Sequence, residues 1–595
     1  MTIAKQRAMM ALVVGAALSL ASCSDDSSTN IGVQVLSFTV GLTSDPANER
    51  VEGTLSLALN APEGFDDVEI ESFDIALTNP GAGPLDNATV ETDTVFPIRM
   101  KAGTSARAHF RLSADSTLPP PPDLSGWCGG SMNVAVEGSL GLAGNSTPFA
   151  GPSAFLERSA PFRAPEVGVS WVTKIPSDHE IGSPVLAIDA AGNTLVGAGS
   201  FDSVSGNFFP PVLTKLDDAG HPLWTRDLGA QGWFFTVTHV AAGADIDIAA
   251  GFFNGTIDLG DGPLDSAGTN AAYVARLDAK GEVLWSRPIQ SVSGEEFGIM
   301  SGITLIAVEV DASDNVLIVG SSEGTAVVIG NETIEPEPGA SSYWPFSFMV
   351  TFSPSGDYIS GKRLGAHVTA VTMDPAGAML LAGPFEGTVN LGGDPLTVGD
   401  QGVWLAKLDA TGEHLWSRAY PANADFLRVT GIEAGPGGEI HIMTRTFDTI
   451  DFGAGFQDGP NTGIFLSKLD AQGGHLWSKP YAKINAEAAP AMAVDDAGRV
   501  FLVGDNFGSI DFGAGLLPND GDFPVLFAAQ LDASGAQLQA ALFGCAAFTP
   551  SALAFRSGVS SSVTFAAPFN RAAALGNQTF SSVTGQDVIV GAFAP

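Results

Sequence analysis

The chain has 595 residues and a formal net charge of −38, from 65 acidic and 27 basic side chains. This acidic surplus repels phosphate backbones and excludes nucleic acid as a partner, because such binding depends on Lys and Arg. The length exceeds one ordinary core, and 45% hydrophobic content with 71 Gly favours compact, turn-rich β structure. Three Cys cannot form a disulfide framework in so long a chain.

The N-terminus has the pattern of a secretion signal. A basic segment with Lys5 and Arg7 precedes an apolar run that is shorter than the roughly 20 residues needed to span a bilayer. The following LASC segment resembles the lipobox of bacterial lipoproteins, in which the Cys is acylated after cleavage. The resemblance implies a signal peptide over 1–22, lipidation of Cys23, a lipidated tether over 23–31, and a lipid-anchored envelope protein, in the outer membrane if the cell is Gram-negative. Ordinary secretion with a chance cysteine is the alternative.

Residues 32–165 alternate apolar and polar side chains, as in RVEGTLSLALN and VEIESFDIAL. Several such strands in this length predict an immunoglobulin-like β-sandwich. The Pro-rich run at 118–123 cannot donate to a sheet and is interpreted as a surface loop. We place the boundary with the next domain near Pro165.

From residue 166 to 595 the chain repeats one unit, with a period near 61 residues. The segment KLDATGEHLWSR has three close copies and two weaker ones, and it alternates with a second motif such as MAVDDAGRVFLVGDNF. Each unit contains four short apolar runs, which we name strands A to D, separated by Gly, Asn and Asp turns. The repeat therefore predicts an all-β, seven-bladed β-propeller. The Trp position of the first motif recurs at 171, 224, 285, 360, 416, 477 and 539.

The two ends of the repeat region predict how the ring closes. The chain enters with a lone strand D at Trp171 and leaves at 587–595 with a strand C that lacks its strand D. Pairing these strands completes one blade and removes exposed sheet edges. The units resemble the SBBP-type propeller repeat of secreted bacterial proteins, and LDATGEHLW is similar to the tryptophan-docking motif of pyrroloquinoline-quinone-type propellers. Both resemblances imply a fold and not a chemistry.

The repeated aromatic and imidazole side chains are assigned structural roles. A row of tryptophans could stack carbohydrate, but each Trp follows an apolar residue at one fixed repeat position, which favours packing between blades. His414 and His475 occupy equivalent positions a blade apart, so a shared metal is disfavoured and a strand-surface role is expected. The structural tryptophans are Trp171, Trp224, Trp285, Trp416 and Trp477.

The segments between strands B and C carry a recurrent hairpin signal, as in GTIDLG and SIDFG. Its single carboxylates, Asp258, Asp451 and Asp511, lack the alternating oxygen ligands of a calcium loop. Asn390 stands at the same place in a fourth copy. Strand extensions are therefore favoured over calcium loops.

Acidic residues also gather in the loops between strands D and A, which meet at one mouth of a propeller channel. Together with His179 and Arg428 they could hold a calcium ion or a basic group, although a solvated acidic rim is the favoured interpretation. These weak metal candidates are Asp178, Glu180, Glu295, Glu296, Asp425 and Glu487. Cys128 and Cys545 are expected at opposite ends of the ring and are predicted to be free thiols.

The sequence contains no zinc-protease, phosphate-loop or nucleophile-elbow motif, and no nucleophile stands beside a base. We therefore expect no catalytic residues and no cofactor, apart from the calcium considered above. The favoured function is a non-catalytic, envelope-anchored binding or scaffold lipoprotein whose propeller face contacts a protein or a glycan. The alternatives are a propeller enzyme, quinoprotein-like or polysaccharide-cleaving, and an outer-membrane assembly factor.

Overall fold

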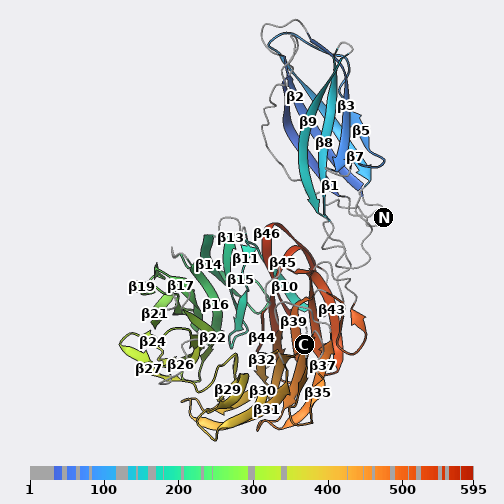
Figure 1. Ribbon diagram of the computed structural model, residues 1–595. Coiled ribbons are helices and arrows are strands. Elements are labelled where there is room, and N and C mark those ends of the chain that lie inside the picture. The colour runs from blue at the N-terminus through green and yellow to red at the C-terminus, as the bar shows by residue number, and fades with distance from the viewer. Residues whose placement is uncertain are drawn as a thin grey trace. The chain divides into compact units, whose positions relative to one another are not determined.

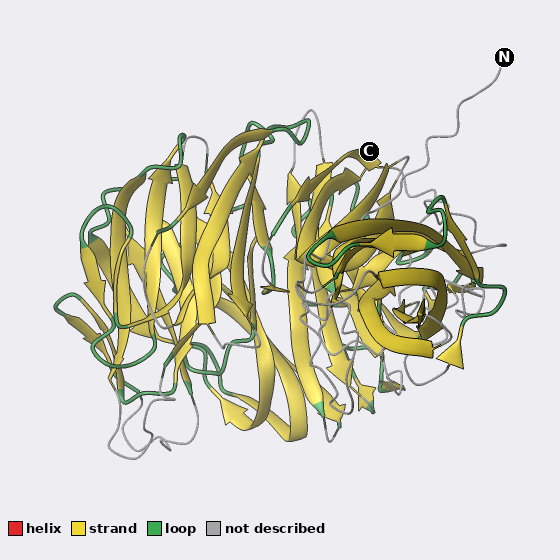
Figure 2. Ribbon diagram, turned by 90° about the horizontal axis from the view of Figure 1, so that it is seen from above, coloured by secondary structure: helices red, strands yellow, loops and turns green. Residues whose placement is uncertain are grey.

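The computed structural model divides the chain into two compact units, Met1–Pro161 and Phe162–Pro595 (Figure 1). All regular elements of its described residues are strands, and no helix there could span a membrane (Figure 2). The structure describes residues 32–42, 50–61, 68–79, 83–115, 131–142, 145–157, 169–177, 180–202, 207–229, 234–243, 246–292, 302–336, 345–424, 426–446, 448–458, 463–482, 490–506, 508–517, 524–546, 552–556, 562–575 and 578–593.

The first unit consists of two antiparallel sheets that share one core. Leu57 and Phe110 from one sheet are buried in the same cluster as Leu77 and Val136 from the other. This follows from the alternating pattern, because every second side chain of a strand points to the same face. The first sheet has the order β1 (Gly32–Leu42), β2 (Arg50–Asn60), β7 (Ser105–Asp115), β5 (Thr89–Thr92), and the second β4 (Gly83–Pro84), β3 (Val68–Asn79), β8 (Ser131–Leu142), β9 (Asn145–Glu157), with β6 (Ile98–Met100) beside β3.

The second unit is built from antiparallel four-stranded blades, each named here after its innermost strand A. The first four are β12 (Val185–Ile188), β13 (Thr194–Asp202), β14 (Asn207–Leu216), β15 (Pro222–Asp227); β16 (Phe234–Ala242), β17 (Ile246–Asn254), β20 (Ala271–Asp278), β21 (Val283–Val292); β22 (Ile303–Val310), β23 (Val316–Ser322), β26 (Phe346–Phe352), β27 (Tyr358–Arg363); and β28 (Ala370–Met373), β29 (Met379–Val389), β30 (Leu396–Leu408), β31 (His414–Asn423). The short strand β11 (Glu180–Ile181) also pairs with β13.

The remaining blades complete the arrangement. They are β32 (Leu427–Ala434), β33 (Ile440–Thr446), β36 (Gly463–Leu469), β37 (His475–Ala482); β38 (Ala491–Val494), β39 (Val500–Asn506), β42 (Val525–Leu531), β43 (Gln537–Ala546); and β44 (Ala552–Arg556), β45 (Ser562–Leu575), β46 (Gln578–Phe593), β10 (Val169–Ile175). Short hairpins extend several B-to-C connections: β18 (Thr256–Asp258) with β19 (Pro263–Asp265), β24 (Ala326–Ile329) with β25 (Glu332–Ile334), β34 (Thr449–Ile450) with β35 (Gln457–Asp458), and β40 (Ile510–Asp511) with β41 (Leu516–Leu517).

The blades are arranged in a ring. Each innermost strand contacts the next, from β12 through β16, β22, β28, β32 and β38 to β44, and β44 contacts β12. The two ends of this unit share one blade, because β10 pairs antiparallel with β46 and places Trp171 opposite Ala592. This arrangement of strands confirms the prediction of an all-β chain that contains a β-propeller.

Aspartates fix the tight turns of the blades. In the A-to-B turn of the β12 blade, Asp189 Oδ1 accepts N–H bonds from Ala191 at 2.9 Å and Asn193 at 2.8 Å. Asp217 does the same in the C-to-D turn for Ala219 and His221. The Asp of each sequence motif therefore satisfies backbone donors that would otherwise be unpaired, as in an Asx-turn.

Candidate functional site

The repeated tryptophans lie at the contacts between neighbouring blades. The Trp285 indole N–H, in the β16 blade, donates to the Pro354 carbonyl of the next blade at 2.9 Å. Its ring covers Gly356, where an added Cβ would meet the ring at 2.7 Å. Since Gly356 also has a φ of 80°, only Gly fits this turn without strain.

The same contact recurs at other positions of the repeat. Trp224 donates to the Ala279 carbonyl at 3.1 Å, and Trp477 donates to the Ala533 carbonyl at 3.0 Å. Trp171 lies against Gly220, whereas Trp416 is half-buried within the core shared by the β28 and β32 blades. These side chains stabilise blade contacts and do not form an exposed binding ladder.

The basic residue of the KLD motif is also held inside the fold. Lys215 Nζ lies 3.0 Å from Asp189 in its own blade and 2.6 Å from the buried Asp247 of the next blade. Removing Lys215 would leave two buried carboxyl groups without a counter-charge, which is costly. This ion-paired cluster therefore joins two blades and offers no open cation site.

The two repeat histidines and the hairpin carboxylates have local partners. His414 and His475 pair through Nε2 with the hydroxyls of Ser417 and Ser478, at 3.0 and 2.9 Å. Asp451 Oδ1 accepts the N–H groups of Gly453 and Gly455, and equivalent bonds form at the other hairpin positions. These equivalent turn residues are Asp258, Asp511 and Asn390.

Most of the predicted acidic rim lies outside the described residues. This applies to Asp178, Glu295, Glu296, Asp425 and Glu487, and to His179. The backbone of Glu180 belongs to β11, and its side chain is not among those described; Arg428 is exposed on β32. Cys23 and Cys128 are likewise outside, and Cys545 is placed only by its backbone, opposite Val525.

A different group of polar residues lies on consecutive innermost strands. Glu309, Thr372 and Glu433 are each the penultimate residue of strand A, in β22, β28 and β32. Because these strands are neighbours in the ring, the three side chains form one arc, which we call the channel arc. The equivalent residues of the β12, β16 and β38 blades are alanines, namely Ala187, Ala241 and Ala493.

Burial changes the protonation of this arc. Desolvation raises the pKa of Glu309 to about 7. Desolvation and the charge of Glu309 raise the pKa of Glu433 to about 8, against a hydrogen bond from the Thr372 hydroxyl. On the adjacent β16, desolvation lowers the pKa of His239 to about 4, against a hydrogen bond to the Ile306 carbonyl. At neutral pH the arc thus combines neutral and anionic carboxyl groups, and the imidazole on the neighbouring strand is neutral.

This arrangement can accept a cationic group or exchange a proton. Both carboxyls titrate near physiological pH, as in many binding and catalytic sites. The described residues contain no group of three His, Cys, Asp or Glu that could hold a metal ion. The sequence does carry a signal for the arc, although it is weak in any single copy: acidic residues in IAVEVD and GIEAG replace the alanine of other copies.

Comparisons with known proteins give matches among solved structures alone. No family model and no curated protein matches the chain. Among solved structures, a protein of unknown function from Dyadobacter fermentans is 10% identical over 72% of this chain and 99% of its own, with a TM-score of 0.33. An α-L-arabinofuranosidase from Fusarium graminearum is 10% identical over 62% and 98%, with a TM-score of 0.34, and an α-L-arabinanase from Penicillium chrysogenum is 8% identical over 62% and 99%, with a TM-score of 0.29. Likeness at this level assigns no activity to the chain.

Proposed function

We propose that the chain is a non-catalytic, envelope-anchored lipoprotein that binds a partner through its propeller. The proposed architecture is an immunoglobulin-like sandwich followed by a closed seven-bladed propeller. Two observations support the architecture: the sheet order of the first unit matches the two-sheet order of immunoglobulin-type domains, and β10 joins the β44 blade. The proposed partner is a protein or a glycan that presents a cationic group.

The channel arc is the observation that carries this proposal. Glu309 and Glu433 place ionisable carboxyl groups at a ring position where β12, β16 and β38 carry alanine. Glu309 and Glu433 are half-buried, and a partly desolvated carboxylate gains more from a paired cation than an exposed one does. An ammonium or guanidinium group inserted into the channel would therefore be bound strongly relative to a neutral group.

The position of the arc sets the side from which a partner would bind. Each member is one residue from the A-to-B turn, at the end of strand A opposite to the D-to-A loops. A single cationic side chain that enters from the A-to-B end would therefore reach the arc, whereas a substrate lying across the mouth formed by the D-to-A loops would not.

The test uses spermidine as the cationic probe at pH 9, where both carboxyls are ionised. We expect spermidine to raise the melting temperature of the wild type by roughly 2 °C or more and to leave a Glu309→Gln, Glu433→Gln variant unchanged. A Glu332→Gln, Glu335→Gln variant, altered at exposed carboxyls of the β24–β25 hairpin, is the matched control and should respond as the wild type does. Equal responses in all three proteins would reject the proposal.

A second candidate function is polysaccharide cleavage, which the pair of titrating carboxyls favours. An acid with a raised pKa beside an ionised carboxylate is the equipment of glycosidases. Turnover in a panel of acidic and neutral glycans that disappears in the Glu309→Gln, Glu433→Gln variant would support the enzyme and replace the binding proposal. We expect no turnover.

The lipid anchor is tested separately at Cys23, which is outside the described residues. Cys23→Ser should move the protein from the detergent extract to the soluble fraction, because lipidation supplies the membrane affinity. Metabolic palmitate label that persists in this variant would contradict the anchor.

A further inference from the structure

Aromatic side chains fill the contact between the β28 and β32 blades and the contact between the β32 and β38 blades. Tyr420 packs against Phe452 of the next blade, with ring centroids 5.0 Å apart, and its hydroxyl donates to the Gly473 carbonyl at 2.6 Å. One blade later, Tyr481 packs against Phe512 at 5.6 Å and donates to the Gly535 carbonyl at 2.7 Å. We call these two contacts the filled junctions.

The junction between the β22 and β28 blades lacks the Tyr and the Phe of the filled junctions, and it also lacks the repeat Trp. Ser360 stands at the Trp position, Leu364 at the position of Tyr420, and Leu391 at the position of Phe452. Phe452 is 2% exposed, whereas Leu391 is only half-buried. We call this contact the hollow junction.

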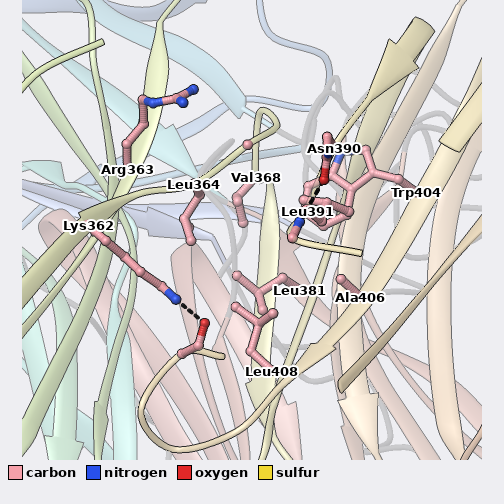
Figure 3. A pocket seen from close by; sticks show the side chains of 13 residues that line it. Lys362, Arg363, Leu364, Val368, Leu381, Asn390, Leu391, Trp404, Ala406 and Leu408 are labelled. Carbon is pink, nitrogen blue, oxygen red and sulfur yellow. Dashed lines mark hydrogen bonds between the residues drawn. The ribbon is translucent and has the colours of Figure 1, made fainter. Parts of the chain in front are cut away.

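A cavity of about 210 Å³ occupies the hollow junction (Figure 3). For scale, an engineered apolar cavity of about 150 Å³ binds benzene. The cavity is open on one side and is lined by polar as well as apolar atoms. Its apolar residues include Leu364, which follows strand D of one blade, and Leu381 and Leu408 on strands B and C of the next. The open side lies near Asn390 and Gly392, which are exposed.

The cavity offers no uncompensated charge to a ligand. The Lys362 ammonium donates to the Gly412 carbonyl and lies 3.7 Å from Glu413. Figure 3 shows the Arg363 guanidinium directed away from the leucines that line the cavity. An uncharged ligand therefore suits the cavity better than an ion.

One polar group in the cavity wall lacks a partner. Trp404 lines the cavity and is 0% exposed, and its indole N–H has no hydrogen-bond acceptor among the described residues. A buried donor without an acceptor is destabilising, so native structures almost always satisfy it. At the same repeat position the β32 and β38 blades carry Phe465 and Phe527, which have no such donor.

We propose that the hollow junction is a binding site for a small, uncharged aromatic molecule that carries a hydrogen-bond acceptor. Its ring takes the volume that Tyr420 and Phe452 fill at a filled junction. Its acceptor receives the Trp404 N–H after a small movement of the wall. This site is separate from the channel arc and does not depend on the function proposed for it.

The first test compares two probes of similar shape, acetophenone and ethylbenzene, by calorimetric titration of the full chain. We expect saturable binding of one acetophenone per chain, about threefold to tenfold tighter than ethylbenzene, because only the ketone accepts a hydrogen bond. Absence of saturable binding by both probes would overturn the proposal.

The second test closes the cavity with a residue that the filled junctions already use. Leu364→Tyr should place its ring in the cavity, with its hydroxyl near the Gly412 carbonyl, and abolish binding of acetophenone. Leu223→Tyr makes the same chemical change at an exposed position of β15 and should bind acetophenone as the wild type does. Unchanged binding in folded Leu364→Tyr would overturn the proposal.

Trp404→Phe provides an independent test in case Leu364→Tyr does not fold. Phenylalanine is native at the equivalent positions 465 and 527, so the variant retains a ring that this strand accommodates. It should bind both probes with equal affinity, because the donor has been removed. A preference for acetophenone that survives this change would overturn the assigned role of Trp404.

Discussion

The filled and hollow junctions differ in three side chains and join blades with the same four-stranded antiparallel order. Between the β32 and β38 blades, Tyr481 and Phe512 are 3% and 1% exposed and close the space between strands. Between the β22 and β28 blades, the smaller residues leave a cavity of about 210 Å³. The ring therefore does not need every aromatic contact, because the innermost strands β22 and β28 contact each other even where the aromatic set is missing.

The largest expected effect is loss of an aromatic residue at a filled junction. Phe512→Ala should lower the free energy of unfolding by about 3–5 kcal/mol, since it removes a buried ring and leaves a void. Leu391→Ala at the hollow junction should cost less than about 2 kcal/mol, because its side chain is half-buried beside existing space. Denaturant unfolding of both variants measures the difference, and equal losses would contradict the distinction between the junctions.

The channel arc should show a pH effect of intermediate size. Glu309 and Glu433 have folded pKa values of about 7 and about 8, above the ordinary value of 4.5. The stability linked to these raised values is fully present below pH 4.5 and is lost as the pH rises through 7 and 8. We expect a loss of about 2–3 kcal/mol, reduced from the full linkage by water in the channel.

The Glu309→Gln, Glu433→Gln variant isolates this effect. Its stability should be nearly flat between pH 6 and pH 9, where the wild type weakens. Thermal unfolding across this pH range provides the measurement. A wild-type profile parallel to that of the variant would show that the arc does not titrate as the structure indicates.

Much of the propeller could be predicted because each repeat carries its own local signals. The Asp that accepts two backbone N–H groups and the Gly that adopts a positive φ fix the turns at Asp217 and Gly220, whatever the neighbouring blade contains. Two such turns and four apolar runs per copy specify the strands. The TIDFG segment likewise predicts a strand extension from its own residues, and β34 with β35 forms it.

The hollow junction could not be predicted in the same way. Its cavity is lined by Leu364 and Leu391, which are unremarkable singly and meet only because the end of strand D of one blade faces the hairpin of the next. The channel arc could not be predicted for the same reason, since its members come from three copies of the repeat. Contacts between copies, and not the copies themselves, define both candidate sites.

Replacement of the buried histidine on β33 should give the next smaller effect on stability. His441 on β33 is 0% exposed, and neither ring nitrogen has a hydrogen-bond partner among the described residues. Apolar residues occupy the equivalent positions of other blades, such as Leu317, Leu380 and Phe501. His441→Leu should therefore stabilise the protein by about 1–3 kcal/mol, by removing unsatisfied polar atoms.

The gain from His441→Leu should also depend on pH. Burial lowers the pKa of His441 to about 3, below the ordinary 6.5, so the wild type loses stability as the pH falls from 6.5 toward 3. The melting-temperature difference between variant and wild type should thus be larger at pH 5 than at pH 7. A difference that is constant or reversed would contradict a neutral, buried imidazole.

The smallest expected effect concerns one hydroxyl at a filled junction. Tyr481→Phe keeps the ring that packs against Phe512 but removes the donor to the Gly535 carbonyl at 2.7 Å. Burial raises the pKa of Tyr481, so the hydroxyl stays neutral and remains a donor throughout the accessible pH range. The variant should lose about 1 kcal/mol of stability, the usual net value of one such bond.

Leu364→Phe at the hollow junction is the counterpart of this variant, because it adds a ring without a hydrogen-bond donor. It should stabilise the protein if filling the cavity matters more there than gaining a hydrogen bond. Stabilisation by Leu364→Tyr but not by Leu364→Phe would instead show that the hydrogen bond to the next blade, and not the ring, is what the hollow junction lacks.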